Sequence, residues 1–182
     1  MASLMEQKLA EPWLRGPIEG VDPSVLPVFF SFTQVREDLN KYVRELTPEQ
    51  VWLNQDGATI GFHLRHIAGS VDRLTTYLMG DQLSAEQLEA MRHEWESGYG
   101  VDQLLRIVDD SFRRSEENLR TIDPSRLYES RKVGRKELPT TVLGLIVHLA
   151  EHTQRHLGQV ITLAKMLRHS EPSGDPRGGR RA

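Results

Sequence analysis

The sequence predicts an all-α protein built as a four-helix bundle, and three observations support this prediction. Apolar residues recur at steps of three and four along four long segments, which is the period of an amphipathic helix. No alternating apolar and polar pattern of comparable length indicates a strand. The chain has 182 residues, 38% of them hydrophobic, which is enough to bury the core of one ordinary domain.

The four predicted helices differ in their apolar pattern. The segments 25–46 and 101–122 each carry one apolar stripe. In the segment 60–78 the apolar steps alternate between four and three, which favours packing at a shallow angle in a bundle. The segment 140–168 is apolar nearly all round in its first half, so we expect it to be the most buried helix.

Capping signals predict two short extra helices in the connections. Thr47 is followed by a proline and, three residues on, by Gln50. Ser84 is followed three residues on by Gln87. Both patterns are typical of a capping box at a helix N-terminus. Trp52, just after the first of these helices, is expected to be an anchor in the core.

Glycine and proline mark the remaining boundaries. Asp56-Gly57 predicts a turn before the second long helix, and Gly80-Asp81 predicts its end. Asp123-Pro124 closes the third segment. Pro139 is expected in the first turn of the fourth long helix, where its missing N–H is tolerated.

Composition sets the domain plan and the class of protein. We expect a bundle over residues 25–168, an N-terminal extension over 1–24 and a disordered tail over 169–182, which is rich in glycine, proline and arginine. A net charge of −3 argues against a nucleic-acid partner. The absence of cysteine excludes disulfides and thiolate ligands and fits a cytoplasmic protein. The most apolar stretch, 142–150, is too short to span a membrane, and no secretory signal is seen.

Five of the seven histidines fall in two of the predicted helices. His63 and His66 lie in the second long helix, and His148, His152 and His156 lie in the fourth. Residues four apart on a helix are separated by about 6 Å along its axis and can share one metal ion. His148 and His156 are about 12 Å apart, too far for bonds of about 2.0–2.1 Å. The spacing therefore leaves two pairs open, His148 with His152 or His152 with His156.

A third ligand from the second long helix would complete a site of three neutral imidazoles. Such a site keeps a coordination position for water or substrate, which is typical of catalytic zinc. The alternative is a bundle whose histidines are hydrogen-bonded in the core and bind no metal. The apolar character of the fourth helix favours the metal, because a buried imidazole without a partner costs about 1–3 kcal/mol.

The segments GFHLRHIAGSVDRL and LPTTVLGLIVHLAEHTQRHLGQVITLAKML resemble the DinB superfamily of DinB/YfiT-like metalloproteins, and the resemblance extends from Pro27 to Arg168. The family implies a four-helix bundle with a three-histidine site for a divalent ion, zinc or nickel. Carried over by position, the ligands are His66, His152 and His156. The resemblance also implies a homodimer.

Several neighbours of these ligands are candidates for the surrounding pocket. His63 either contacts substrate or lines the pocket, and His148 is placed to form hydrogen bonds near the site. Gln159 is a candidate to orient a ligand or a bound water. Arg155 either holds an anionic substrate or is simply solvated. The segment 93–95 is a candidate to border the pocket.

The resemblance implies an enzyme acting on a small molecule. Characterised relatives include transferases and isomerases that use a low-molecular-weight thiol such as bacillithiol or mycothiol as cosubstrate, and hydrolases. The sequence offers no convincing general base, because Glu151 points about 100° away from His152 on the helix. This favours an alternative function, a non-catalytic stress or interaction protein in which the ion is structural.

Overall fold

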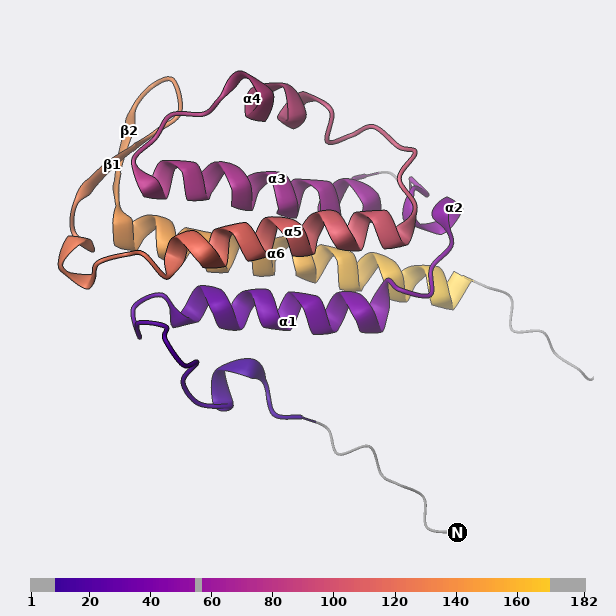
Figure 1. The fold of residues 1–182 in the computed structure, drawn as a ribbon. Coiled ribbons are helices and arrows are strands. Elements are labelled where there is room, and N and C mark those ends of the chain that lie inside the picture. Colours follow the sequence, from indigo (N-terminus) through magenta and orange to yellow (C-terminus); the bar gives the residue numbers. More distant parts are fainter. Residues whose placement is uncertain (1–8, 55–56, 171–182) are drawn as a thin grey trace, which may run out of the picture.

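Four long helices form the body of the molecule, with short helices and one hairpin in the connections (Figure 1). The computed structural model describes residues 9–54 and 57–170. The helices are α1 (Leu26–Tyr42), α2 (Pro48–Val51), α3 (Ile60–Met79), α4 (Ala85–Arg92), α5 (Val101–Leu119) and α6 (Val142–Ser170), and the 3₁₀ turns are η1 (Pro12–Leu14) and η2 (Pro124–Arg126). The predicted all-α fold is confirmed.

The long helices pack as two parallel pairs. Helix α6 packs against both α1 and α3, and α3 packs against α5. In Figure 1, α1 and α6 run in one direction, while α3 and α5 run in the other. Helices α3 and α6 are therefore antiparallel neighbours, so residues far apart in the sequence meet across their interface.

The core fills the space between the four long helices with the predicted apolar stripes. Phe32 of α1 and Phe112 of α5 stack with their ring centroids 4.0 Å apart, and both are fully buried. Leu64 and Ile67 of α3 and Leu149 of α6 are also fully buried. Burying each such side chain stabilises the fold by about 1.5–3 kcal/mol, so these stripes hold the bundle together.

The most buried helix is α3, and the expectation that it would be the last helix is wrong. Thirteen of the 20 residues of α3 are buried. In the first half of α6, by contrast, Val147 is 56% exposed. The reason is position: α3 lies between α5 and α6 and also contacts α4, whereas one flank of α6 is left uncovered.

The predicted capping signals are confirmed at both short helices. Thr47 and Gln50 form a capping box at α2, and Ser84 and Gln87 form one at α4. Gly80 ends α3 with a left-handed φ of 98°. Of the turn predicted at Asp56-Gly57, Asp56 lies outside the described residues, as does the predicted tail beyond residue 170.

Trp52 is the core anchor that the sequence predicts. It packs against the core, and its indole N–H donates to the Tyr99 carbonyl at 2.8 Å. Its ring lies so close to Gly61 that a Cβ there would be 2.6 Å from Trp52 Cη2. The start of α3 is thus fixed against the α2 connection by an aromatic side chain over a glycine.

A β-hairpin precedes α6 where the sequence predicts no strand. Strands β1 (Ser130–Val133) and β2 (Leu138–Thr141) pair antiparallel, with Lys132 opposite Pro139. Pro139 is therefore in a strand and not in the first turn of the helix, which begins at Val142. Four-residue strands are too short for an alternating pattern to be recognised, and a two-stranded hairpin tolerates proline because both strands are edges.

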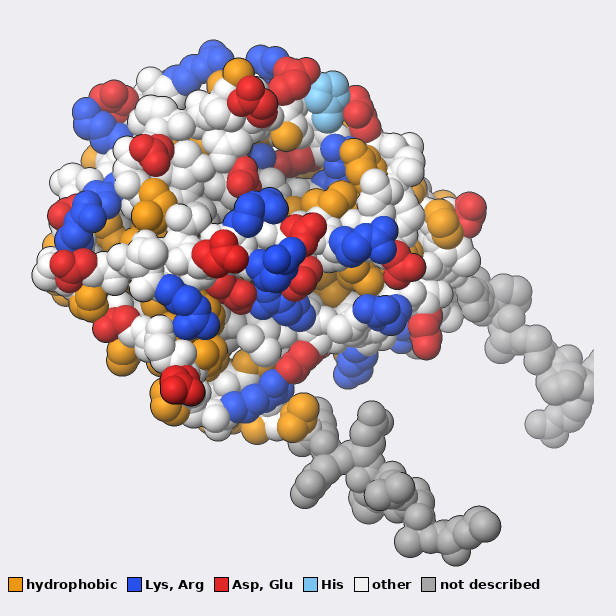
Figure 2. Space-filling view, in the orientation of Figure 1, with side chains coloured by type: hydrophobic (Ala, Val, Ile, Leu, Met, Phe, Trp, Pro, Cys, Tyr) orange, Lys and Arg blue, Asp and Glu red, His pale blue; other side chains and the backbone are white. Residues whose placement is uncertain are grey.

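Charged side chains of both signs are interspersed on the face seen in Figure 2. Arg36 of α1 bridges to Asp109 at 2.7 Å and to Glu116 at 2.6 Å, both on α5. The described helices include none long and apolar enough to cross a membrane.

Candidate metal centre

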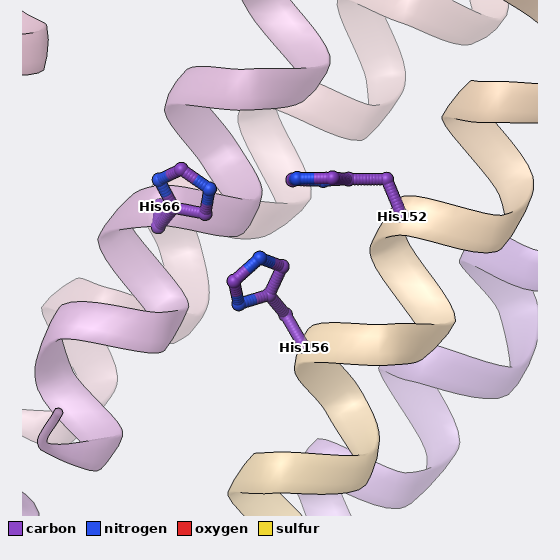
Figure 3. Close-up of side chains that lie close together, drawn as sticks. All are labelled: His66, His152 and His156. Carbon is purple, nitrogen blue, oxygen red and sulfur yellow. The ribbon is translucent and has the colours of Figure 1, made fainter. Parts of the chain in front are cut away.

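His66, His152 and His156 converge between α3 and α6 (Figure 3). The ring of His156 lies 4.4 Å from that of His66 and 4.6 Å from that of His152, centroid to centroid. One nitrogen from each ring lies within 4.8 Å of the others. The arrangement follows from the sequence, because His152 and His156 are one turn apart on α6 and α3 packs against that face.

The three rings fit a divalent metal ion. In a tetrahedral site with bonds of about 2.0–2.1 Å, two ligand nitrogens lie about 3.3–3.4 Å apart, so the three rings would close in on the ion from their present spacing of 4.8 Å or less. His152 Nδ1 is buried and has no hydrogen-bond partner among the described residues. Buried polar atoms in proteins normally have a partner, and an ion or a water at the cluster would supply one for the His152 ring.

Burial keeps two of these imidazoles neutral near pH 7. Desolvation, and next the charge of His66, lower the pKa of His152 to about 4. Desolvation and then His66 and His152 lower the pKa of His156 to about 4. Neutral imidazole is the form that binds metal, so His152 and His156 need not lose protons on binding near pH 7.

Glu94 is hydrogen-bonded to the His66 ring. Its Oε2 accepts from His66 Nδ1 at 2.7 Å, and its Oε1 accepts from Arg73 Nη1 at 2.7 Å. Glu94 is only 5% exposed. Burial by itself would raise the pKa of Glu94, but the hydrogen bonds from His66 and Arg73 outweigh it and leave the pKa below its usual value. The side chain is therefore a carboxylate.

His63 is a buried member of the cluster. Its Nδ1 lies 3.0 Å from His156 Nδ1, so one of the two rings donates to the other. Burial, followed by the charge of His66, lowers the pKa of His63 to about 4. His63 contacts the candidate ligand His156, but it is not part of the lining of the pocket beside His66 and His152, so its two predicted roles stay predictions.

The other candidates on α6 lie at the edge of the site or outside it. His148 lies 5.2 Å from His152, centroid to centroid, and its Nδ1 bonds Glu151 Oε1 at 2.6 Å. Arg155 is exposed and donates to the other oxygen of Glu151 at 2.6 Å. Gln159 is exposed, and no described contact joins it to the cluster.

The three residues of the segment 93–95 have different surroundings. His93 is half-buried and forms hydrogen bonds with Glu89 and Glu96, not with the cluster. Trp95 stacks on Phe62 at 3.7 Å, and Phe62 in turn stacks on His66 at 5.4 Å, centroid to centroid. Only the middle residue, Glu94, touches a candidate ligand.

Sequence reasoning missed Arg73 and Phe62. Arg73 lies seven residues after His66, two turns along the same face of α3, and this spacing was a signal that could have found it. Phe62 lies one turn before His66. Glu94 was named as a candidate, but no periodicity predicts which side chain of an irregular connection turns inward.

A pocket of about 250 Å³ adjoins His66 and His152. Its apolar lining comes from Leu74, Leu83 and Met91. Its polar lining includes, besides the two candidate ligands, the side chains Ser70, Arg73, Tyr77 and His148. The space suits a small organic molecule whose reacting group reaches the cluster.

The fold and the cluster together define a helical bundle with a candidate three-histidine metal centre. The sequence profile of the DinB superfamily matches residues 31–160, which include all three histidines. The chain belongs to the DinB superfamily. A comparison with curated proteins finds no match.

Proposed function

We propose that the protein is a metal-dependent enzyme that acts on a small molecule, as a thiol S-transferase or a hydrolase. His66, His152 and His156 would hold one divalent ion, zinc or nickel. The observation that carries the proposal is the convergence of three imidazoles beside a pocket of about 250 Å³. Three protein ligands leave a coordination position for a group from outside the protein, as catalytic sites require.

Different residues around the cluster would bind the ion, the apolar part of the substrate and its polar groups. An ion held there would lower the pKa of a water or a thiol and so supply a nucleophile near neutral pH. Leu74, Leu83 and Met91 would hold the apolar part of the substrate. Tyr77 and His148 line the same pocket and offer hydrogen bonds to its polar groups. A low-molecular-weight thiol as cosubstrate remains part of this proposal.

A non-catalytic metal-binding protein is the second candidate, and the engaged carboxylates favour it. Both oxygens of Glu94 are hydrogen-bonded, one to His66 and one to Arg73. Both oxygens of Glu151 are hydrogen-bonded as well, one to His148 and one to Arg155. These hydrogen bonds outweigh desolvation and leave the pKa of both carboxyls below the usual value, which makes each a weaker general base. In this alternative the ion would join α3 to α6. A homodimer and a cytoplasmic location stay predictions under both functions.

The first experiment is elemental analysis of protein purified without a polyhistidine tag, wild type beside His152→Ala. We expect close to one zinc or nickel ion per chain in the wild type and its loss in His152→Ala. His148→Ala is the matched control, because this histidine lies on the same helix outside the triplet, and it should keep the ion. Wild-type protein that takes up neither zinc nor nickel on incubation would contradict both metal-based functions.

Turnover separates the two metal-based functions. Metal-loaded wild-type protein is assayed with thiol acceptors and with ester substrates, before and after chelation. Turnover that needs the ion supports the enzyme. Tight metal binding with no turnover, together with a large fall in melting temperature on chelation, favours the structural ion.

A further inference from the structure

We propose that Glu94 is a positioning residue for the candidate metal centre. It holds the His66 ring with its proton on Nδ1 and its Nε2 lone pair free for the ion. Arg73 and Gly69 in turn hold Glu94 in place. The role toward an ion rests on the proposed function, but the orientation of the ring does not, and it can be measured in metal-free protein.

The chemistry of the contact fixes the tautomer. A carboxylate only accepts hydrogen bonds, so the 2.7 Å contact to Glu94 Oε2 requires His66 Nδ1 to be the donor. A neutral imidazole with its proton on Nδ1 presents an unprotonated Nε2. Partners of this kind on the far nitrogen of a metal-binding histidine fix its ring orientation and make it a stronger ligand.

Gly69 makes room for the carboxylate. It lies on α3 between His66 and Arg73, the two residues that Glu94 bridges. A Cβ at position 69 would overlap Glu94 Oε1 and lie 2.8 Å from Arg73 Nη1. Glycine weakens a helix interior relative to alanine. Its presence here is explained by the approach of Glu94 to the helix surface.

The two residues that follow Glu94 also fasten this segment to α3. Trp95 stacks on Phe62 at 3.7 Å, centroid to centroid. The carbonyl of the next residue, Glu96, accepts from Arg65 Nη1 at 2.8 Å. Residues 94–96 of the connection therefore all contact α3 in the turns around His66. These contacts hold the backbone where the Glu94 side chain points toward His66.

Stability alone does not account for the pair. Glu94 and Arg73 are both nearly buried, at 5% and 9% exposure. Burying two opposite charges gives little or no net stability compared with apolar side chains of similar size. The orientation of the His66 imidazole would explain why these two charges are buried here.

The test replaces Glu94 and follows His66. Nitrogen chemical shifts of His66 in metal-free protein should report a proton on Nδ1 in the wild type and a mixture of tautomers in Glu94→Ala. Glu94→Gln has one acceptor oxygen instead of two, and the charged Arg73 guanidinium should take it. The amide NH2 then faces His66 Nδ1, so the proton of the ring should move to Nε2 in this variant. Competition with a chromophoric chelator should show Zn²⁺ binding about 10–100-fold weaker in Glu94→Ala than in the wild type.

Two further variants complete the design. Gly69→Ala should displace the carboxylate without removing it and weaken Zn²⁺ binding in the same direction. Glu96→Ala is the matched control, because this carboxylate lies two residues on and, among the described residues, is hydrogen-bonded to His93 and not to the cluster. Its Zn²⁺ affinity should stay within about twofold of wild type. Circular dichroism confirms that each variant is folded.

The outcomes separate this inference from the proposed function. A wild-type tautomer and wild-type Zn²⁺ affinity in Glu94→Ala would overturn the positioning role. Wild-type protein without affinity for Zn²⁺ or Ni²⁺ would sink the proposed function, and the nitrogen shifts would still decide whether Glu94 sets the His66 ring.

Discussion

At the scale of single residues, three buried histidines make the stability of the metal-free protein depend on pH. The pKa of His63, His152 and His156 is about 4 in the folded chain, against an ordinary value of 6.5. Below about pH 6.5 the unfolded chain therefore binds protons that the folded chain does not. Stability should therefore fall as the pH decreases from 6.5 toward 4, and the contribution of these three histidines should be constant below that.

Urea unfolding of chelator-treated protein at pH 8, 6 and 5 checks this prediction. Each proton taken up on unfolding lowers the free energy of unfolding by at most about 1.4 kcal/mol per pH unit. The window above pH 5 keeps ordinary carboxylates ionised, so their titration does not interfere. Equal free energies of unfolding at pH 8 and pH 5 would show that the rings are not buried in the neutral form.

The sequence could predict these histidines only in part. Helical spacing alone limits the α6 pair to two choices, and the resemblance to the DinB superfamily selects His152 with His156. The structure brings this pair together with His66. The contact from Glu94 could not be predicted, because it depends on the path of a connection, which neither periodicity nor capping specifies.

At the scale of elements, two glycines should respond in opposite ways to alanine. At Gly61 of α3 a Cβ would lie 2.6–2.7 Å from the Trp52 ring, so Gly61→Ala should destabilise the protein by about 1–3 kcal/mol. At Gly158 of α6 a Cβ would meet nothing within 4 Å. Gly158→Ala should stabilise by up to about 1 kcal/mol, because alanine favours the helix.

Chemical denaturation of the two variants beside wild type measures both effects. Gly158→Ala serves as the control for Gly61→Ala, since both replace a glycine inside a long helix. Shifts of the same sign would mean that Trp52 does not pack on α3 as described.

The long helices could be predicted from the sequence better than their ends. The predicted segment 25–46 becomes a helix over Leu26–Tyr42, and 101–122 becomes Val101–Leu119. Apolar residues beyond these ends still face the core, as Val43 and Leu46 do, although they are no longer helical. Burial continues past the last helical turn, so the apolar pattern overstates the length of these two helices.

At the scale of the whole molecule, the proposed ion should stabilise the bundle. It would bind the folded chain and not the unfolded one, which lacks the assembled site. Free Zn²⁺ at 100 times its dissociation constant then adds about 2.7 kcal/mol, which for a chain of this size raises the melting temperature by roughly 5–10 °C. Scanning calorimetry with and without chelator measures the shift. His152→Ala should show none, and a wild type insensitive to chelation would contradict the prediction.

The β1–β2 hairpin divides the three histidines along the chain. His66 precedes it, His152 and His156 follow it, and residues 135–137 at its tip are exposed. A backbone cut at this tip would give two pieces, one with a single imidazole and the other with two. Neither piece alone could complete the triplet. Binding of the ion would then be coupled to association of the two pieces. A chain divided at this tip would therefore report the metal by fragment complementation.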